Sequence, residues 1–175
     1  MILKIAITGP ESTGKTTLAE QLAQHYQTVW VPERARTYLN ELGGKPYKEK
    51  DLVEIARQQL ALEEEMAPKA NKVLFCDTEL VVMKIWSQVK YGHVDPWIEA
   101  QMLQKRYHHY LLLYPDLPWT PDPQREHPHL REQMFRLYQG ELKKLKRPFT
   151  MIQGEGEERL KAAVKAVDKV LAAAR

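Results

Sequence analysis

The sequence predicts a three-layer α/β fold, in which a parallel sheet of five strands lies between two layers of helices. Five short runs of apolar, β-branched or aromatic residues recur along the chain and are typical of buried strands. Segments with apolar residues three or four positions apart separate these runs and are typical of amphipathic helices. Strands that are apolar almost throughout and alternate with helices indicate a parallel sheet covered by helices on both faces.

The predicted strands and helices follow one another in order along the chain. The strands comprise residues 2–8, 28–31, 73–77, 110–114 and 149–152. A helix is predicted after the first strand, where Leu18, Leu22 and Tyr26 share one face. The last helix has an apolar face made of Leu160, Val164, Val167 and Leu171.

Two further segments have patterns that predict a long helix and a long loop. Residues 48–69 predict a long helix, in which Glu63, Glu64 and Glu65 are expected to face water. Residues 115–128 contain five prolines, which exclude a continuous helix or a central strand. Long loops of this kind often act as lids, so a lid is predicted at residues 115–131.

Length, charge and cysteine content limit the class of protein. The chain has 175 residues, which suit a single domain over residues 1–175. The net charge of +3 comes from nearly balanced acidic and basic residues and gives no reason to expect a nucleic acid partner. The first apolar run is too short to cross a membrane. The single cysteine, Cys76, is expected to be buried, which favours a reducing, cytoplasmic compartment.

A phosphate-binding motif lies between the first predicted strand and the helix that follows it. The run GPESTGKT at residues 9–16 fits the Walker A pattern GxxxxGK[ST] in this strand-to-helix context. Such a loop offers backbone N–H groups to phosphate oxygens, and its glycines let the chain approach closely. The residues expected to bind ATP are Gly9, Glu11, Ser12, Thr13, Gly14, Lys15, Thr16 and Thr17.

Two residues of the motif have individual predicted roles. Lys15 is expected to reach the β- and γ-phosphates and to offset the charge that builds up during transfer. The Thr16 hydroxyl is expected to be a ligand of Mg²⁺, so ATP and Mg²⁺ are the predicted cofactors. The motif alone does not separate kinases from ATPases, GTPases or switch proteins, and other residues must indicate the acceptor.

Carboxylates follow two predicted strands at the sheet edge where α/β proteins bind ligands. Glu33 is a candidate general base that would orient an acceptor hydroxyl and accept its proton. Alternatively, it is a charge at a helix N-terminus. Asp77 is a candidate ligand of Mg²⁺ or of its water shell, and could instead contact the acceptor or be the base. Thr78 and Glu79 fit a role at a helix start as well as a chemical one.

Arginines of the predicted lid are the remaining catalytic candidates. Arg125 and Arg131 flank residues 126–127, and arginines on a closing lid can stabilise a phosphoryl group in transit. Solvated loop charges are the alternative interpretation. The turn at residues 153–159 could pack against an adenine. Aromatic residues that could stack on a planar acceptor ring, or simply pack in the core, are Trp86, Tyr91, Trp97 and Trp119.

Four segments together resemble the kinase domain of the NadR family. They are GPESTGKTTL, VPERAR, FCDTELVVMKIWSQVKYG and YLLLYPDLPWTPDPQREHPHLR, and they span most of the chain. The Walker A part is shared by many nucleotide-binding proteins. The combination of the DTE strand end, the Pro- and Trp-containing loop and REHP is much more specific to the family. The resemblance implies a nucleoside-kinase-like P-loop NTPase fold, and transfer from ATP to the 5′-hydroxyl of nicotinamide riboside to give nicotinamide mononucleotide.

The sequence also departs from the full-length family pattern. It shows neither a preceding DNA-binding domain nor an adenylyltransferase domain with an HxGH-like motif. The resemblance is therefore not expected to extend to repressor or adenylyltransferase activity. A similarity to deoxynucleoside kinases supports Glu33 as the base and keeps other nucleosides and nucleotides open as acceptors. The expected partner is a small nucleoside-type substrate, without nucleic acid or membrane. A P-loop ATPase switch is the alternative from a different class.

Overall fold

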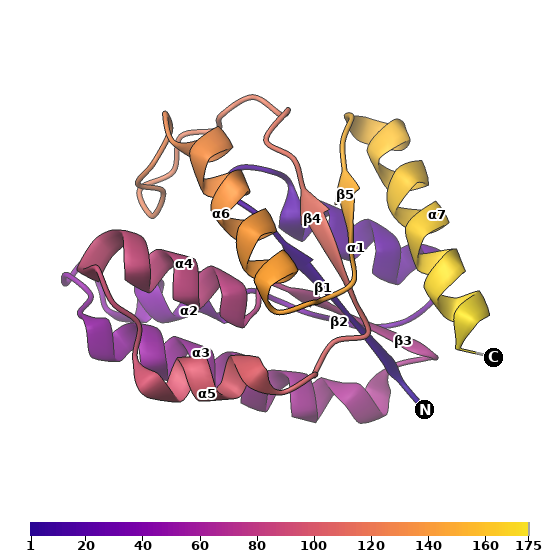
Figure 1. Cartoon of the computed structure of the whole chain (residues 1–175), viewed down its shortest axis with the longest axis horizontal. Coiled ribbons are helices and arrows are strands. Elements are labelled where there is room, and N and C mark those ends of the chain that lie inside the picture. The colour runs from indigo at the N-terminus through magenta and orange to yellow at the C-terminus, as the bar shows by residue number, and fades with distance from the viewer. Residues whose placement is uncertain (175) are drawn as a thin grey trace.

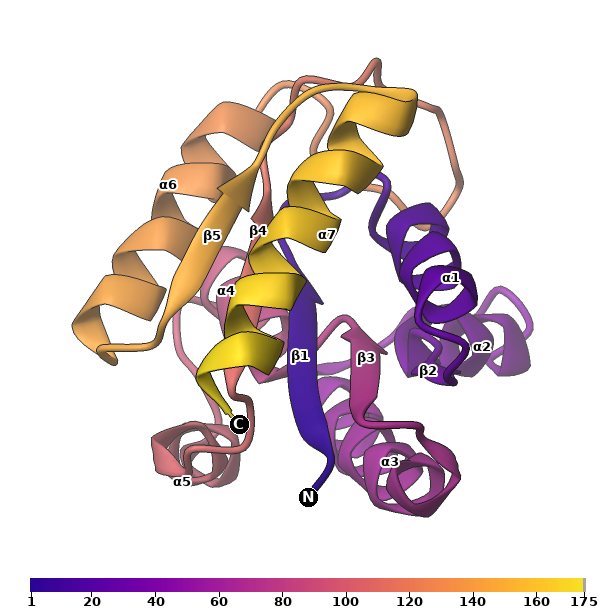
Figure 2. The same ribbon diagram turned by 90° about the vertical axis from the view of Figure 1, so that its right-hand side faces the viewer.

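The fold is built on a central parallel sheet, described by a computed structural model for residues 1–174. The sheet has five strands in the order β2-β3-β1-β4-β5, and each neighbouring pair is parallel. Figure 1 shows the sheet among the helices, and the order of the strands across it can be followed in Figure 2. The strands are β1 (Leu3–Thr8), β2 (Trp30–Val31), β3 (Val73–Asp77), β4 (His109–Leu113) and β5 (Phe149–Ile152).

Helices cover both faces of this sheet. One buried apolar cluster joins one face to α2–α6, and a second cluster joins the other face to α1 and α7. The predicted three-layer α/β fold with five parallel strands is therefore confirmed. The α-helices are α1 (Lys15–His25), α2 (Arg34–Glu41), α3 (Glu49–Met66), α4 (Leu80–Tyr91), α5 (Pro96–Leu103), α6 (Arg131–Lys144) and α7 (Gly156–Ala173), and a 3₁₀ turn (Ala67–Lys69) follows α3.

The second strand is shorter than the predicted range 28–31. Gln27 has a positive φ of 50° and turns the chain after α1. The hydroxyl of Thr28 then donates a hydrogen bond of 2.7 Å to the backbone carbonyl of Val73, at the start of β3. Only the two residues of β2 are left to pair with β3.

The expectation that Glu63 faces water is wrong. Its side chain is 1% exposed, and Lys4 Nζ lies 3.7 Å from its Oε2. The hydroxyl of Tyr107 donates a 2.6 Å hydrogen bond to its Oε1. Glu63 follows the buried Gln59 by four residues, so both lie on the face of α3 that packs inward. The two glutamates that follow are exposed, as predicted.

The loops at the carboxyl ends of the strands gather at one end of the molecule, because all strands run in the same direction. The longest connection, residues 114–130, joins β4 to α6 at this end, and residues 1 and 174 lie at the other (Figures 1 and 2). Arg131, the last residue of the predicted lid, is the first residue of α6. Among residues 1–174, no helix is long and apolar enough to cross a membrane.

Candidate active site

The loop between β1 and α1 has a backbone that few side chains tolerate. Gly9, Ser12 and Gly14 have positive φ values of 142°, 57° and 80°. A Cβ on Gly9 would lie 2.8 Å from the carbonyl oxygen of Leu113 in β4, so this close approach requires glycine. Gly14 precedes α1 and has no side chain to cap the helix, so the first N–H groups of α1 stay available to an anion.

Lys15 starts α1, and its ammonium turns back over the loop. Nζ donates hydrogen bonds to the carbonyl oxygens of Gly9 at 3.0 Å and Pro10 at 2.8 Å. Burial lowers the pKa of this ammonium, while the carboxylates of Glu33 and Asp77 act in the opposite direction. Phosphate oxygens bound in the loop could replace the two carbonyls as partners of the ammonium, as predicted for Lys15.

Thr16 and Asp77 connect α1 to the end of β3. Thr16 Oγ1 donates a hydrogen bond of 2.6 Å to Asp77 Oδ2. Burial raises the pKa of Asp77 to about 6 and Glu33 adds to the rise, although Thr16 and Lys15 oppose it. Hydroxyl and carboxylate oxygens are the ligands that Mg²⁺ prefers. The exposed Thr16 hydroxyl and the buried Asp77 carboxylate therefore form an oxygen pair beside the phosphate loop that fits the predicted Mg²⁺.

A cavity of about 190 Å³ opens beside the phosphate loop. All eight residues predicted to bind ATP line it. Glu33 and Arg36 line it from the start of α2, Trp86 from α4, and Arg125 from the segment predicted to be a lid. Glu33 precedes α2, but its side chain makes no capping hydrogen bond. The structure therefore brings the phosphate loop, the carboxylate of Glu33 and two arginines to one cavity, whereas Asp77 does not line it.

The phosphate loop holds the segment at residues 114–130, which we call the lid segment. The carboxylate of Glu11 accepts hydrogen bonds from the backbone N–H groups of Glu126 and His127, each at 3.2 Å. The hydroxyl of Ser12 accepts one from the backbone N–H of Thr120 at 2.9 Å. The lid segment thus lies over the loop, and its opening and closing stay a prediction.

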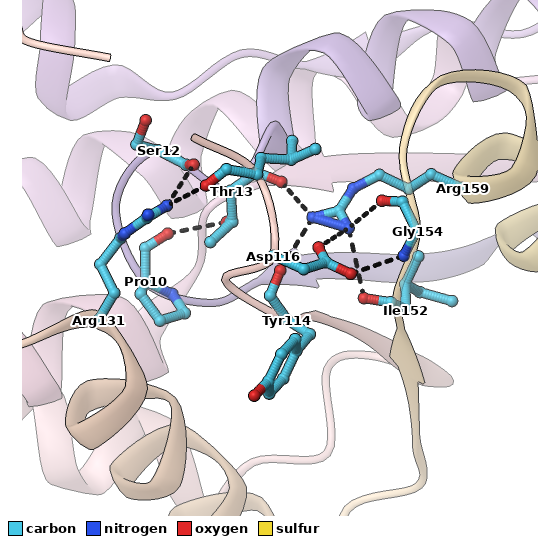
Figure 3. Close-up of polar contacts among 10 residues, drawn as sticks. Pro10, Ser12, Thr13, Tyr114, Asp116, Arg131, Ile152, Gly154 and Arg159 are labelled. Atoms are coloured by element: carbon cyan, nitrogen blue, oxygen red, sulfur yellow. Dashed lines mark hydrogen bonds and ion pairs between the residues drawn. The ribbon is translucent and has the colours of Figure 1, made fainter. Parts of the chain in front are cut away.

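The two arginines predicted to stabilise the phosphoryl group occupy different places. Arg125 lines the cavity. Arg131 Nη1 instead donates hydrogen bonds to the backbone carbonyls of Ser12 at 3.1 Å and Leu117 at 2.8 Å (Figure 3). It does not line the cavity, so direct contact between Arg131 and a phosphoryl group stays a prediction.

Glu79 has a structural role at the start of α4. It accepts hydrogen bonds of 2.8 Å from the backbone N–H of Val81 and from the hydroxyl of Thr8. Burial raises its pKa to about 7. The helix-start interpretation of Glu79 is therefore confirmed.

The tryptophans of the predicted acceptor region separate into different environments. Trp86 lines the cavity, and its indole N–H donates to the hydroxyl of Tyr47 at 2.9 Å. The guanidinium of Arg57 stacks 4.2 Å from the ring centre of Trp97, which does not line the cavity. Of the three predicted tryptophans, Trp86 is therefore the one that lines the cavity.

A buried arginine behind the phosphate loop was not predicted. Arg159 lies near the start of α7 with its side chain 6% exposed, and its Nη1 lies 3.1 Å from Asp116 Oδ1. Its Nη2 donates to the backbone carbonyl of Thr13 at 2.7 Å (Figure 3). Arg159 precedes the buried Ala163 by four residues. The signal in the sequence that could have identified Arg159 is the position of this charged residue in line with the apolar face of the last helix.

A model of the family described as an AAA domain matches residues 4–159. Two relatives are the trifunctional NAD biosynthesis/regulator proteins NadR of Salmonella typhimurium (strain LT2) and Escherichia coli (strain K12). Each is 32% identical over an alignment of 124 positions, which covers 67% of this chain and 30% of the relative. The predicted resemblance to NadR is confirmed, and the aligned part is about 30% of the length of these relatives.

Solved structures share the fold at lower identity. NadR in complex with NR has a TM-score of 0.80 and 18% identity, over 97% of this chain and 51% of that one. NadR with NAD and AMP-PNP has a TM-score of 0.76 and 19% identity, over 97% and 50%. Deoxyadenosine kinase of M. mycoides has a TM-score of 0.65 and 13% identity, over 95% and 100%. With the fold of P-loop nucleoside kinases and a family match from β1 into α7, this chain belongs to the AAA domain family.

Proposed function

We propose that this chain is an ATP- and Mg²⁺-dependent kinase that phosphorylates the 5′-hydroxyl of nicotinamide riboside and forms nicotinamide mononucleotide. The observation that carries this proposal is the single cavity that joins the phosphate loop, Glu33 and Arg125. Relatives named for NAD biosynthesis and a similar structure solved with NR support the choice of acceptor. A cytoplasmic location, expected from the single cysteine, is part of the proposal.

Binding and charge compensation come mainly from the phosphate loop. Its backbone N–H groups would hold the β- and γ-phosphates, and Lys15 would offset the charge that develops between them. Arg125 would contact the transferring group from the lid segment. Thr16 and Asp77 would hold Mg²⁺, which when bound supplies further positive charge to the phosphates.

Glu33 is the base in this proposal. Its carboxylate lines the cavity and caps no helix, so it is available to an acceptor hydroxyl. It would accept the hydroxyl proton as the oxygen bonds to the γ-phosphorus and the bond to the ADP oxygen breaks. Asp77 already accepts the hydroxyl of Thr16 behind the loop, which suits a metal ligand better than a base.

A second candidate is a kinase for another nucleoside or a nucleotide. The likeness to deoxyadenosine kinase, and to thymidylate kinase of Ehrlichia chaffeensis with a TM-score of 0.63 and 12% identity, favours it. Both candidates use the same phosphate loop and differ only in the acceptor. A P-loop ATPase switch would instead release ADP without a small acceptor.

The test is to measure ADP release from Mg-ATP across a panel of acceptors. The panel contains nicotinamide riboside, common nucleosides, nucleoside monophosphates and a sample without acceptor. We expect nicotinamide riboside to give the strongest stimulation, and Lys15→Ala to abolish it with the fold retained. Stimulation by another acceptor alone would replace the substrate, and acceptor-independent release would favour the switch.

A further inference from the structure

Two arginines hold consecutive carbonyls of the phosphate loop from outside the cavity. Arg131 at the start of α6 donates to the carbonyl of Ser12 at 3.1 Å, and Arg159 of α7 donates to the carbonyl of Thr13 at 2.7 Å. Figure 3 shows the two side chains reaching the loop from opposite sides. Neither arginine lines the cavity, so neither guanidinium reaches the loop from the cavity side.

Because the peptide bond is planar, the direction of a carbonyl group fixes the direction of the N–H group that follows it. The peptide bonds of residues 1–174 are all trans. In a trans peptide, the C=O and the following N–H point in opposite directions. A Thr13 carbonyl turned towards Arg159 therefore turns the N–H of Gly14 away from Arg159. In the same way, the contact of Arg131 with Ser12 turns the N–H of Thr13 away from Arg131.

The N–H groups turned in this way belong to residues that line the cavity, Thr13 and Gly14. Ser12 and Gly14 have positive φ values of 57° and 80°, with Thr13 between them. Alternation of this kind makes successive N–H groups converge on an anion. A cation on the carbonyl side also polarises the peptide group and strengthens its N–H as a donor.

Arg159 is itself held in place by several partners. Nη2 also donates to the carbonyl of Tyr114 at 3.0 Å, after β4. Nη1 donates to Asp116 Oδ1 at 3.1 Å and to the carbonyl of Gly154 at 3.2 Å, after β5. Asp116 Oδ2 in turn accepts the N–H of Gly154 at 2.7 Å. One guanidinium thus joins the phosphate loop to the ends of two strands.

We propose that Arg159, assisted by Arg131, is a positioning residue that aims the N–H groups of the phosphate loop at the di- or triphosphate of a nucleotide. Arg159 does not itself contact the phosphates in this arrangement. The inference rests on the proposed function for the nucleotide ligand, but it does not depend on which acceptor is phosphorylated.

The variant that tests this is Arg159→Lys. An ammonium has three donors and lacks the fixed geometry of a guanidinium, so it cannot serve the backbone carbonyls of Thr13, Tyr114 and Gly154 together with Asp116. The matched control is Arg147→Lys. Arg147 is also buried, at 8% exposure, and donates to three backbone carbonyls at the end of α5, away from the phosphate loop. Both variants remove one buried guanidinium and should lower the melting temperature similarly.

The probes are Mg-ADP and inorganic tripolyphosphate, with binding measured by calorimetry. We expect Arg159→Lys to weaken both by about tenfold, the usual effect of losing a charge-assisted hydrogen bond, and Arg147→Lys to leave both nearly unchanged. Labelling with ¹⁵N-glycine gives eight amide signals at most. The shift of the Gly14 signal on ADP binding should shrink in Arg159→Lys alone.

Unchanged affinity in Arg159→Lys, or an equal loss in Arg147→Lys, would overturn the inference. If Arg159→Lys does not fold, Asp116→Asn replaces it, because it weakens the anchor and keeps the guanidinium. It should reduce ADP affinity in the same direction by a smaller factor, and unchanged affinity would again refute the proposal. A chain that binds ADP in this Arg159-dependent way but phosphorylates no acceptor would refute the proposed function alone.

Discussion

The two carboxylates proposed as base and metal ligand, Glu33 and Asp77, have different surroundings. Asp77 is fully buried at the end of β3 and accepts a hydrogen bond from Thr16. Glu33 is half-buried at the cavity wall and caps no helix. A base must reach the acceptor, whereas a metal ligand must be fixed beside the phosphates. These surroundings support the proposal that Glu33 is the base and Asp77 the metal ligand, a choice that the sequence left open.

Substitution of each carboxylate by its amide separates these roles. Glu33→Gln should lower turnover by roughly 10²-fold while ADP affinity stays the same, because a general base contributes on this scale. Asp77→Asn should instead raise the Mg²⁺ concentration needed for half-maximal rate. Steady-state rates over a Mg²⁺ series, together with ADP titrations, measure both. If Glu33→Gln changes only the Mg²⁺ requirement and Asp77→Asn removes turnover, the assignment is reversed.

The elements of the fold could be predicted because their patterns are local. β3 and β5 have the predicted bounds, since each is a short run ended by turn-forming or charged residues. β2 could not be bounded in this way, because the side chain of Thr28 contacts Val73 far along the chain. The arrangement of the lid segment depends on contacts of the same long-range kind. Its prolines predict a loop and do not indicate the loop's partners.

The lid segment is the element whose motion can be tested directly. Glu11 supplies the acceptor for two of its backbone N–H groups. Glu11→Ala should therefore raise the rate of tryptic cleavage after Arg125 by roughly fivefold, the effect of losing about one hydrogen bond. Mass spectrometry of timed digests measures the rate. Glu20→Ala, at an exposed glutamate of α1, is the control. Equal cleavage in all three proteins would show that Glu11 does not hold the segment.

At the scale of the whole molecule, the parallel arrangement of the five strands follows from the alternation of strands and helices along the sequence. The contacts of the buried polar groups do not follow from it. Sequence periodicity predicts which face of a helix is buried, but it does not predict which residues contact that face. Glu63 and Arg159 are both charges on inward faces, and each is accommodated by particular partners from other elements. Prediction from sequence therefore located the phosphate loop between β1 and α1 and missed the buried arginine behind it.

Glu63 should make the stability of the folded protein depend on pH. Burial raises its pKa from 4.5 to about 7, so the folded protein binds this proton more tightly than the unfolded chain does. The resulting stability is present at low pH and is lost as the pH rises from 4.5 to about 7. Glu63→Gln should raise the free energy of unfolding at pH 8 by about 1–3 kcal/mol.

Urea unfolding of both proteins between pH 5 and pH 8 checks this expectation. The amide oxygen introduced by Glu63→Gln can still accept the Tyr107 hydroxyl, and Lys4 keeps its ion pair of 2.7 Å with Glu64. Asp77 and Glu79 also have raised pKa values, so the pH dependence should shrink without disappearing. If the free energy of unfolding changes with pH equally in the two proteins, Glu63 is not the source of the pH dependence.

The buried position of Cys76 has a practical consequence for spectroscopy. It is the only cysteine of the chain, it is 0% exposed, and burial raises the pKa of its thiol. A maleimide dye reacts with exposed thiolates, so it should leave Cys76 untouched. Replacement of the exposed Thr120 by cysteine would give one reactive thiol on the lid segment. A single fluorophore could then report lid motion in real time, with the buried native thiol left in place.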